Sequence, residues 1–130
     1  MHAERIDGTT DLPFDLELVS VSYVAPDRTV DVVVKAGASS GCWVVHFKNV
    51  EGVRILDERD LLEYWPSCST RNGSLYRIHS GGWIEQESRR EGFLLRDVCE
   101  YLVTSFHECV SVLAYDIPKV VVHAECQNRG

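Results

Sequence analysis

The side chains that could do chemistry in this chain are five histidines, five cysteines and several carboxylates close together in the sequence. No two histidines stand at H-x-x-x-H or H-x-H spacing, which would place both imidazoles on one face of a helix or strand. The densest group of metal-ligand types is His107-Glu108-Cys109, whose adjacent side chains splay apart in a turn. We therefore predict no metal site, no cofactor and no catalytic residue.

The cysteines indicate structural thiols. A nucleophilic cysteine needs a helix N-terminus or a cationic neighbour to stabilise its thiolate, and no cysteine opens the helix predicted below. Cys68 lies in the polar stretch SCSTRNG near Arg71 and is the best candidate for an exposed, reactive thiol. The cysteine count is odd, no C-x-x-C occurs, and Cys42, Cys99 and Cys109 sit in apolar strand patterns. We expect free thiols in a reduced, cytoplasmic protein.

An acidic and aromatic group follows a Gly-Gly turn. Trp83 stands directly after Gly82, and two carboxylates lie two residues apart on one face of the predicted strand that it opens. A solvated strand face and a core tryptophan are the plain interpretations, and an acid–base carboxylate pair is a third. An exposed tryptophan beside carboxylates also suits a protein-binding hot spot. The predicted partner-binding patch consists of Tyr76, Trp83, Glu85, Glu87 and Glu91.

The stretch that organises the chain runs from 41 to 66. Residues 42–49 alternate, with Trp43, Val45 and Phe47 on the face assigned to the core. Glu51-Gly52 predicts a turn, followed by a short return strand. Asp57 then predicts the start of a helix that ends before Pro66. The apolar stripe of this helix, which we expect to pack on the core, is Leu61, Leu62 and Trp65.

The remaining elements read as strands joined by short turns. The first hairpin has strands at 14–24 and 29–36 around a turn at 25–28, with a bulge near Val19. A second hairpin is predicted from strands 75–79 and 83–87. Further strands are expected at 99–106, 109–115 and 119–124. The predicted fold is mainly β (α+β): a curved antiparallel sheet or open barrel of about eight strands, with one short helix packed on the core.

Length and charge narrow the choice of partners. A chain of 130 residues fits one domain, for which residues 1–11 and 125–130 are predicted as frayed termini. The net charge of −7 argues against nucleic-acid and anionic-membrane surfaces, and leaves room for a basic protein partner. No apolar run reaches the roughly 20 residues that a membrane span needs. The N-terminal MHAERIDGTTDLP has no apolar core typical of a secretory signal.

The run from FKNVEGVRILDERDLLEYW through GGWIEQE to ECVSVLAYDIPKVVV resembles small bacterial domains of the toxin-immunity kind. That resemblance implies a small, acidic, non-catalytic protein that acts by protein–protein binding. One alternative is a β domain that binds a small ligand in a pocket lined by Trp43, Phe47 and Tyr101. Another is an enzyme whose site converges only in three dimensions. The strand at 119–124 carries little charge, so a homodimer through this edge strand is a further expectation.

Overall fold

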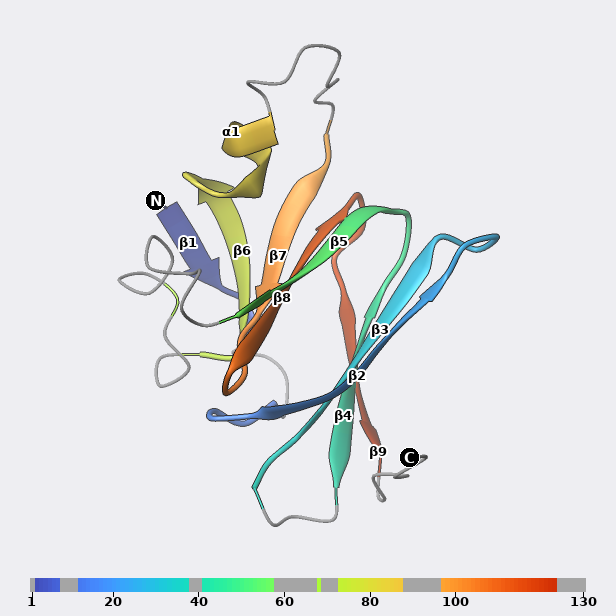
Figure 1. Cartoon of the computed structure of the whole chain (residues 1–130), viewed down its shortest axis with the longest axis vertical. Helices are drawn as coiled ribbons and strands as arrows, with labels where there is room; N and C mark the ends of the chain where they lie inside the picture. Colours follow the sequence, from blue (N-terminus) through green and yellow to red (C-terminus); the bar gives the residue numbers. More distant parts are fainter. Residues whose placement is uncertain are drawn as a thin grey trace.

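The computed structural model describes residues 2–7, 12–37, 41–57, 68, 73–87 and 97–123. This part of the chain forms two antiparallel sheets and one short helix (Figure 1). The five-stranded sheet has the order β1-β6-β7-β8-β5, and the four-stranded sheet has the order β2-β3-β4-β9. The predicted mainly β class with one short helix is confirmed. The elements are β1 (His2–Arg5), β2 (Glu17–Val24), β3 (Thr29–Lys35), β4 (Cys42–Phe47), β5 (Val50–Asp57), β6 (Leu75–Ser80), α1 (Trp83–Glu87), β7 (Cys99–Val103), β8 (Glu108–Ala114) and β9 (Lys119–His123).

One hydrophobic core joins the two sheets. Alternate residues of β3 and β4 enter it from one side, and alternate residues of β7 and β8 enter it from the other. The rings of Phe47 and Tyr101 meet across the core with centroids 5.9 Å apart. Phe47 and Val45 are fully buried and Trp43 packs against the cluster, so the core face predicted for residues 42–49 is confirmed.

The other face of the five-stranded sheet is also buried. A second cluster there contains Cys68, Tyr76, Ile78, Leu102 and Cys109. Strands β7 and β8 therefore have apolar side chains on both faces, which explains their nearly continuous apolar sequence. This sheet lies between the main core and a second layer of packing.

The predicted hairpin of 75–79 with 83–87 is wrong. Strand β6 pairs with β1 and β7, and residues 83–87 form helix α1. The amide N–H of Trp83 donates to Glu100 Oε1 at 2.7 Å, and that of Gln86 donates to Gly82 O at 3.2 Å. Because a helical turn and a carboxylate satisfy these amides, the segment needs no strand partner. Of the helix predicted after residue 56, Asp57 is the last residue of β5, and 58–66 lie outside the described residues.

The chain turns earlier than predicted between β4 and β5. Residues 51–52 lie within β5, and Asn49 makes the turn with a φ of 51°. Asparagine tolerates this left-handed conformation better than most residues. β5 pairs with β8 and not with β4, so the chain passes from one sheet to the other at this turn.

Both ends of the described chain lie in sheets. His2–Arg5 form β1, which pairs with β6, so residues 2–5 are not the frayed terminus that the sequence predicted. Residues 125–130 lie outside the described residues. The β2–β3 hairpin, its turn at 25–28 and the irregularity near Val19 are confirmed, the last by a register shift between Leu18 and Ser20.

Candidate functional site

The structure buries one residue of the predicted partner-binding patch. Tyr76 is only 3% exposed on β6, because it faces the second cluster. Burial raises the pKa of Tyr76 to about 12, with smaller contributions from Cys68 and Asp7 that Arg5 opposes. Trp83 is half-buried and Glu85 is exposed on α1. The side chain of Glu87 and all of Glu91 lie outside the described residues. The prediction that Tyr76 lies on the surface is wrong, because this residue is buried.

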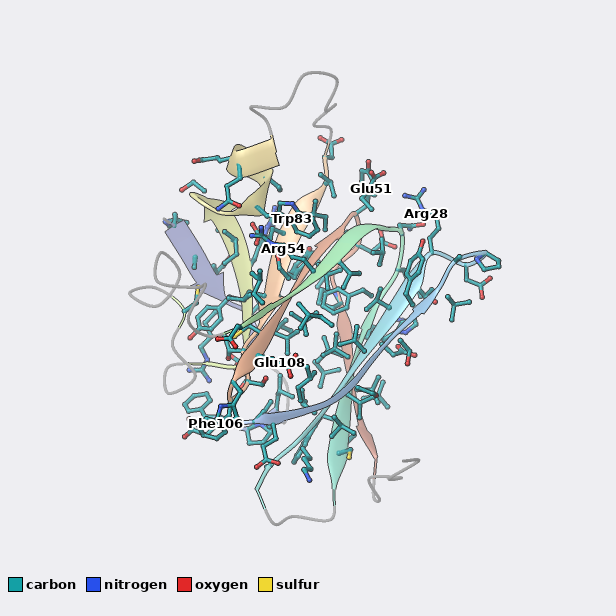
Figure 2. All side chains as sticks on the ribbon, viewed as in Figure 1. Arg28, Glu51, Arg54, Trp83, Phe106 and Glu108 are labelled. Atoms are coloured by element: carbon teal, nitrogen blue, oxygen red, sulfur yellow. The ribbon has the colours of Figure 1, made fainter. Side chains whose placement is uncertain are left out.

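Trp83 connects α1 to strand β5. The guanidinium carbon of Arg54 lies 4.7 Å from the centroid of the Trp83 ring, and Arg54 Nη1 donates to Gln86 Oε1 at 3.1 Å. Figure 2 shows these two side chains together above β5. The ring also lies against Gly52, where an added Cβ would come within 2.9 Å of Trp83 Cη2. Trp83 therefore covers one face of β5 at Gly52.

A surface hollow of about 350 Å³ adjoins the same part of β5. It is lined by Tyr23, Val50, Glu51, Gly52 and Val53. Tyr23 comes from the end of β2 and is 54% exposed. The register shift between Val50 and Gly52 adds a residue to β5 at Glu51. Bulges commonly reorient a side chain at the edge of a sheet, and β5 is an edge strand.

The carboxylate of Glu51 is held in place from two sides. Arg28 Nη2 donates to Glu51 Oε1 at 3.2 Å, and the hydroxyl of Tyr115 donates to the same oxygen at 3.0 Å. Arg28 also donates from Nε to Val50 O at 3.2 Å, and accepts from Val50 N–H at its own carbonyl at 3.0 Å. Arg28 and Glu51 lie close together at the β2–β3 turn in Figure 2. The β2–β3 turn is thereby tied to the start of β5.

A second set of hydrogen bonds ties the end of β8 to the β4–β5 turn. The N–H of Tyr115 donates to Asn49 O at 3.2 Å, and Asn49 Nδ2 donates to Asp116 Oδ2 at 2.8 Å. Tyr115 is 39% exposed. We name the hollow with Tyr23, Arg28, Glu51 and Tyr115 the Glu51 site. Sequence reasoning missed it, because its members come from three separate segments and no local pattern predicts that these segments meet.

The ligand pocket that the sequence suggested, lined by Trp43, Phe47 and Tyr101, is filled by side chains. Phe47 and Tyr101 are 0% and 1% exposed and pack against each other in the core. Burial raises the pKa of Tyr101 to about 12, and the neighbouring Cys99 adds to this effect. Trp43 is half-buried at the margin of the same core. These aromatic rings fill space that a ligand would need.

The cysteines differ from the sequence-based expectation at two positions. Cys68 is fully buried, and burial raises its pKa to about 12, with further contributions from Glu100 and Cys109. A thiol with this pKa is protonated at neutral pH, so Cys68 is wrong as an exposed reactive thiol. Cys42 is disulfide-bonded, whereas Cys68, Cys99 and Cys109 form no disulfide. The prediction of a free thiol at Cys42 is therefore wrong.

Two histidines form hydrogen bonds with carboxylates across strands. His46 Nδ1 lies 2.5 Å from Asp31 Oδ1, and His79 Nε2 lies 2.9 Å from Glu4 Oε1. His2 packs edge-on against His79, with ring centroids 5.0 Å apart. Within the described ranges, no three His, Cys, Asp or Glu side chains are placed to hold one metal ion.

Comparisons with known proteins add no family to this description. No protein-family model matches the chain, and no curated protein or solved structure is significantly similar to it. In the part of the chain that the structure describes, no helix is both long enough and apolar enough to cross a membrane.

Proposed function

We propose that this protein acts by binding another protein at the Glu51 site. The observation that carries this proposal is the pair of exposed tyrosines, Tyr23 and Tyr115, beside a fixed Arg28–Glu51 pair and a hollow. Tyrosine and arginine are enriched among residues that dominate protein–protein binding energy. The ring of a tyrosine buries a large apolar area at an interface, while its hydroxyl keeps a polar contact. The hollow offers space for a side chain of the partner.

The charges around the Glu51 site favour a basic partner. Among the described residues, contacts to the Glu51 carboxylate reach only Oε1, and the side chain is 42% exposed. Asp27 and Asp116 lie exposed in the adjoining turns. A lysine or arginine of a partner would meet Glu51 Oε2 beside the ring of Tyr23. The net charge of −7 would speed the encounter with such a partner at low salt.

The resemblance to toxin-immunity domains agrees with this proposal. A protein of that kind neutralises a partner by occupying its surface, and it needs no chemistry of its own. A small-ligand-binding function is the second candidate. The observation that favours it is the hollow of about 350 Å³, which lies at the small end of ligand pockets.

We also propose that the protein is cytoplasmic, as the sequence predicts. The Cys42 disulfide is an observation against it, because disulfides persist mainly in oxidising compartments. Acid quenching of intact cells, followed by alkylation of the denatured protein without reductant and by peptide mapping, distinguishes a cytoplasmic from an oxidising location, because Cys42 is only 2% exposed in the folded protein. A cytoplasmic protein would have Cys42 alkylated before any reductant is added.

The test of the binding function is affinity capture of tagged variants from the native cells, with quantification of the co-purified proteins. Tyr23→Ala and Glu51→Gln remove the ring and the charge, and the glutamine retains an oxygen for Arg28 and Tyr115. We expect each to weaken the purified complex by about tenfold or more in calorimetry. Glu85→Gln is the matched control, since Glu85 is also exposed but lies on α1 outside the site.

The outcomes separate the two surfaces. Loss of a partner in the Glu51 and Tyr23 variants, with retention in the Glu85 variant, supports the Glu51 site. Loss only in the Glu85 variant would move the binding surface to the patch predicted from the sequence. A small molecule recovered with the wild type, and lost in Tyr23→Ala, would support the second candidate instead.

A further inference from the structure

The four edge strands of the two sheets differ in regularity. In the five-stranded sheet, β1 has only four residues and pairs with β6 across a register shift in which β6 carries the extra residue, and β5 carries an extra residue of its own between Val50 and Gly52. In the four-stranded sheet, β2 has a shift between Leu18 and Ser20. Such irregularities hinder the pairing of an edge with another chain. Of these four described edges, β9 alone pairs with its neighbour in continuous register, from Lys119 to His123.

The side chains of β9 do not protect its edge either. Its centre is Val120-Val121-Val122, and Lys119 is its one residue with a permanent positive charge. Val121 is 46% exposed and Val122 is 54% exposed, and successive residues of a strand point to opposite faces. Both faces of this edge therefore present apolar surface. Figure 1 shows β9 at the border of its sheet, with β4 on its inner side.

We propose that β9 pairs with β9 of a second copy of this chain, antiparallel about a two-fold axis at Val121. This pairing places Val121 opposite Val121, and Val120 of each copy opposite Val122 of the other. Residues directly opposite in an antiparallel pair share a face, so the exposed Val122 comes to lie beside a half-buried Val120. The contact uses the β9 edge of both copies, so the assembly closes at a dimer.

The rest of the sheet is continuous with this contact. Val33, Val44 and Val121 are register neighbours on β3, β4 and β9, and they form an apolar row on the face turned away from the core. Pairing across the axis extends the row through both copies, and joins two four-stranded sheets into one of eight strands. The match of the strand to itself and this continuity identify a second copy as the occupant of the edge.

Sedimentation equilibrium of the purified full chain over a concentration series tests this proposal. We expect a reversible monomer–dimer equilibrium with a dissociation constant of about 10 to 100 µM, since five paired residues bury far less than a standard interface of about 1,600 Å². Val121→Lys should raise that constant at least about tenfold, because the two introduced lysines would face each other across the axis. Val24→Lys is the matched control. Val24 is also 46% exposed, and it lies on β2 at the opposite edge of the same sheet.

A dimer that survives Val24→Lys and is lost in Val121→Lys supports pairing through β9. A wild-type monomer at about 500 µM, or equal loss of the dimer in both variants, would overturn it. Hydrogen exchange of the wild type gives a readout that needs no variant. The β9 amides should exchange faster on dilution below the dissociation constant, and an exchange rate independent of concentration would contradict the proposal.

Discussion

At the residue scale, Arg28 has the backbone conformation that is least favoured for its residue type. It has a φ of 52° in the turn closed by Arg28 N–H to Ala25 O at 3.2 Å. This left-handed position at the end of a hairpin turn usually holds glycine, because a side chain there costs about 1 kcal/mol. The guanidinium of Arg28 reaches both Val50 O and Glu51. Strain in the backbone at this residue therefore coincides with the polar frame of the Glu51 site, as it often does at functional sites.

Replacing Arg28 separates the strain from the contacts. Arg28→Ala loses the side-chain contacts and keeps the unfavourable φ, whereas Arg28→Gly loses the contacts and removes the strain. We expect Arg28→Gly to be more stable than Arg28→Ala by about 1 kcal/mol in urea unfolding. Equal stability of the two variants would show that the turn relaxes without a side chain to hold it. Because both lack the guanidinium, both should weaken partner binding at the Glu51 site.

At the element scale, α1 depends on its surroundings. A helix of five residues is too short to persist alone. It is anchored by the buried carboxylate of Glu100, which accepts from Trp83 N–H and from the Ser111 hydroxyl, each at 2.7 Å. Two glycines leave space for this arrangement. Gly82 adjoins Glu100, and Gly52 adjoins the Trp83 ring.

Alanine at these two glycines should have unequal effects. A Cβ at Gly82 would overlap Glu100 Oε1 and lie 2.8 Å from Ile78 Cγ2, whereas a Cβ at Gly52 would lie 2.9 Å from the Trp83 ring alone. We expect Gly82→Ala to lower the free energy of unfolding by about 2 kcal/mol or more, and Gly52→Ala by about 1 kcal/mol. Urea unfolding measures both. A larger loss for Gly52→Ala would mean that the Trp83 ring, not the Glu100 anchor, holds α1 in place.

At the scale of the whole molecule, one buried thiol and two buried tyrosine hydroxyls make the free energy of unfolding depend on pH in the alkaline range. Burial raises the pKa of the Cys68 thiol, the Tyr76 hydroxyl and the Tyr101 hydroxyl, each to about 12. Their ordinary values are 9.0 for the thiol and 10.0 for the two hydroxyls. Above these values the unfolded chain loses protons that the folded chain keeps, and unfolding becomes more favourable. The stability is therefore full below about pH 9 and falls as the pH rises towards 12.

We expect this loss to depend measurably on Cys68. Each such group contributes at most about 1.4 kcal/mol per pH unit between its unfolded and folded pKa values. Cys68→Ala should therefore reduce the fall in unfolding free energy between pH 9 and pH 10. The measurement is urea unfolding at pH 7.5, 9 and 10, with Cys99→Ala, at a half-buried position, as the comparison. An unchanged pH dependence in Cys68→Ala would show that the thiol ionises without unfolding.

Local patterns predicted most of the strands, including β9, whose partner β4 lies far away in the sequence. The alternation in 29–36 and 42–49, the Pro-Asp turn at 25–28 and the irregularity near Val19 all appear in the structure. The short segment WIEQE could not be assigned in this way. Its five residues suit a strand or a helical turn, and the choice depends on Glu100, which lies 17 residues from Trp83 in the chain.

The sequence by itself determined the mainly β class, because a two-residue alternation fixes which side chains of a strand share a face. It also determined that 42–49 turns Trp43, Val45 and Phe47 towards the core. Only the tertiary structure decided that β4 and β5, neighbours in sequence, belong to different sheets. That crossing brings Tyr23, Arg28, Glu51 and Tyr115 together, and it depends on burial between distant segments, which no local pattern records.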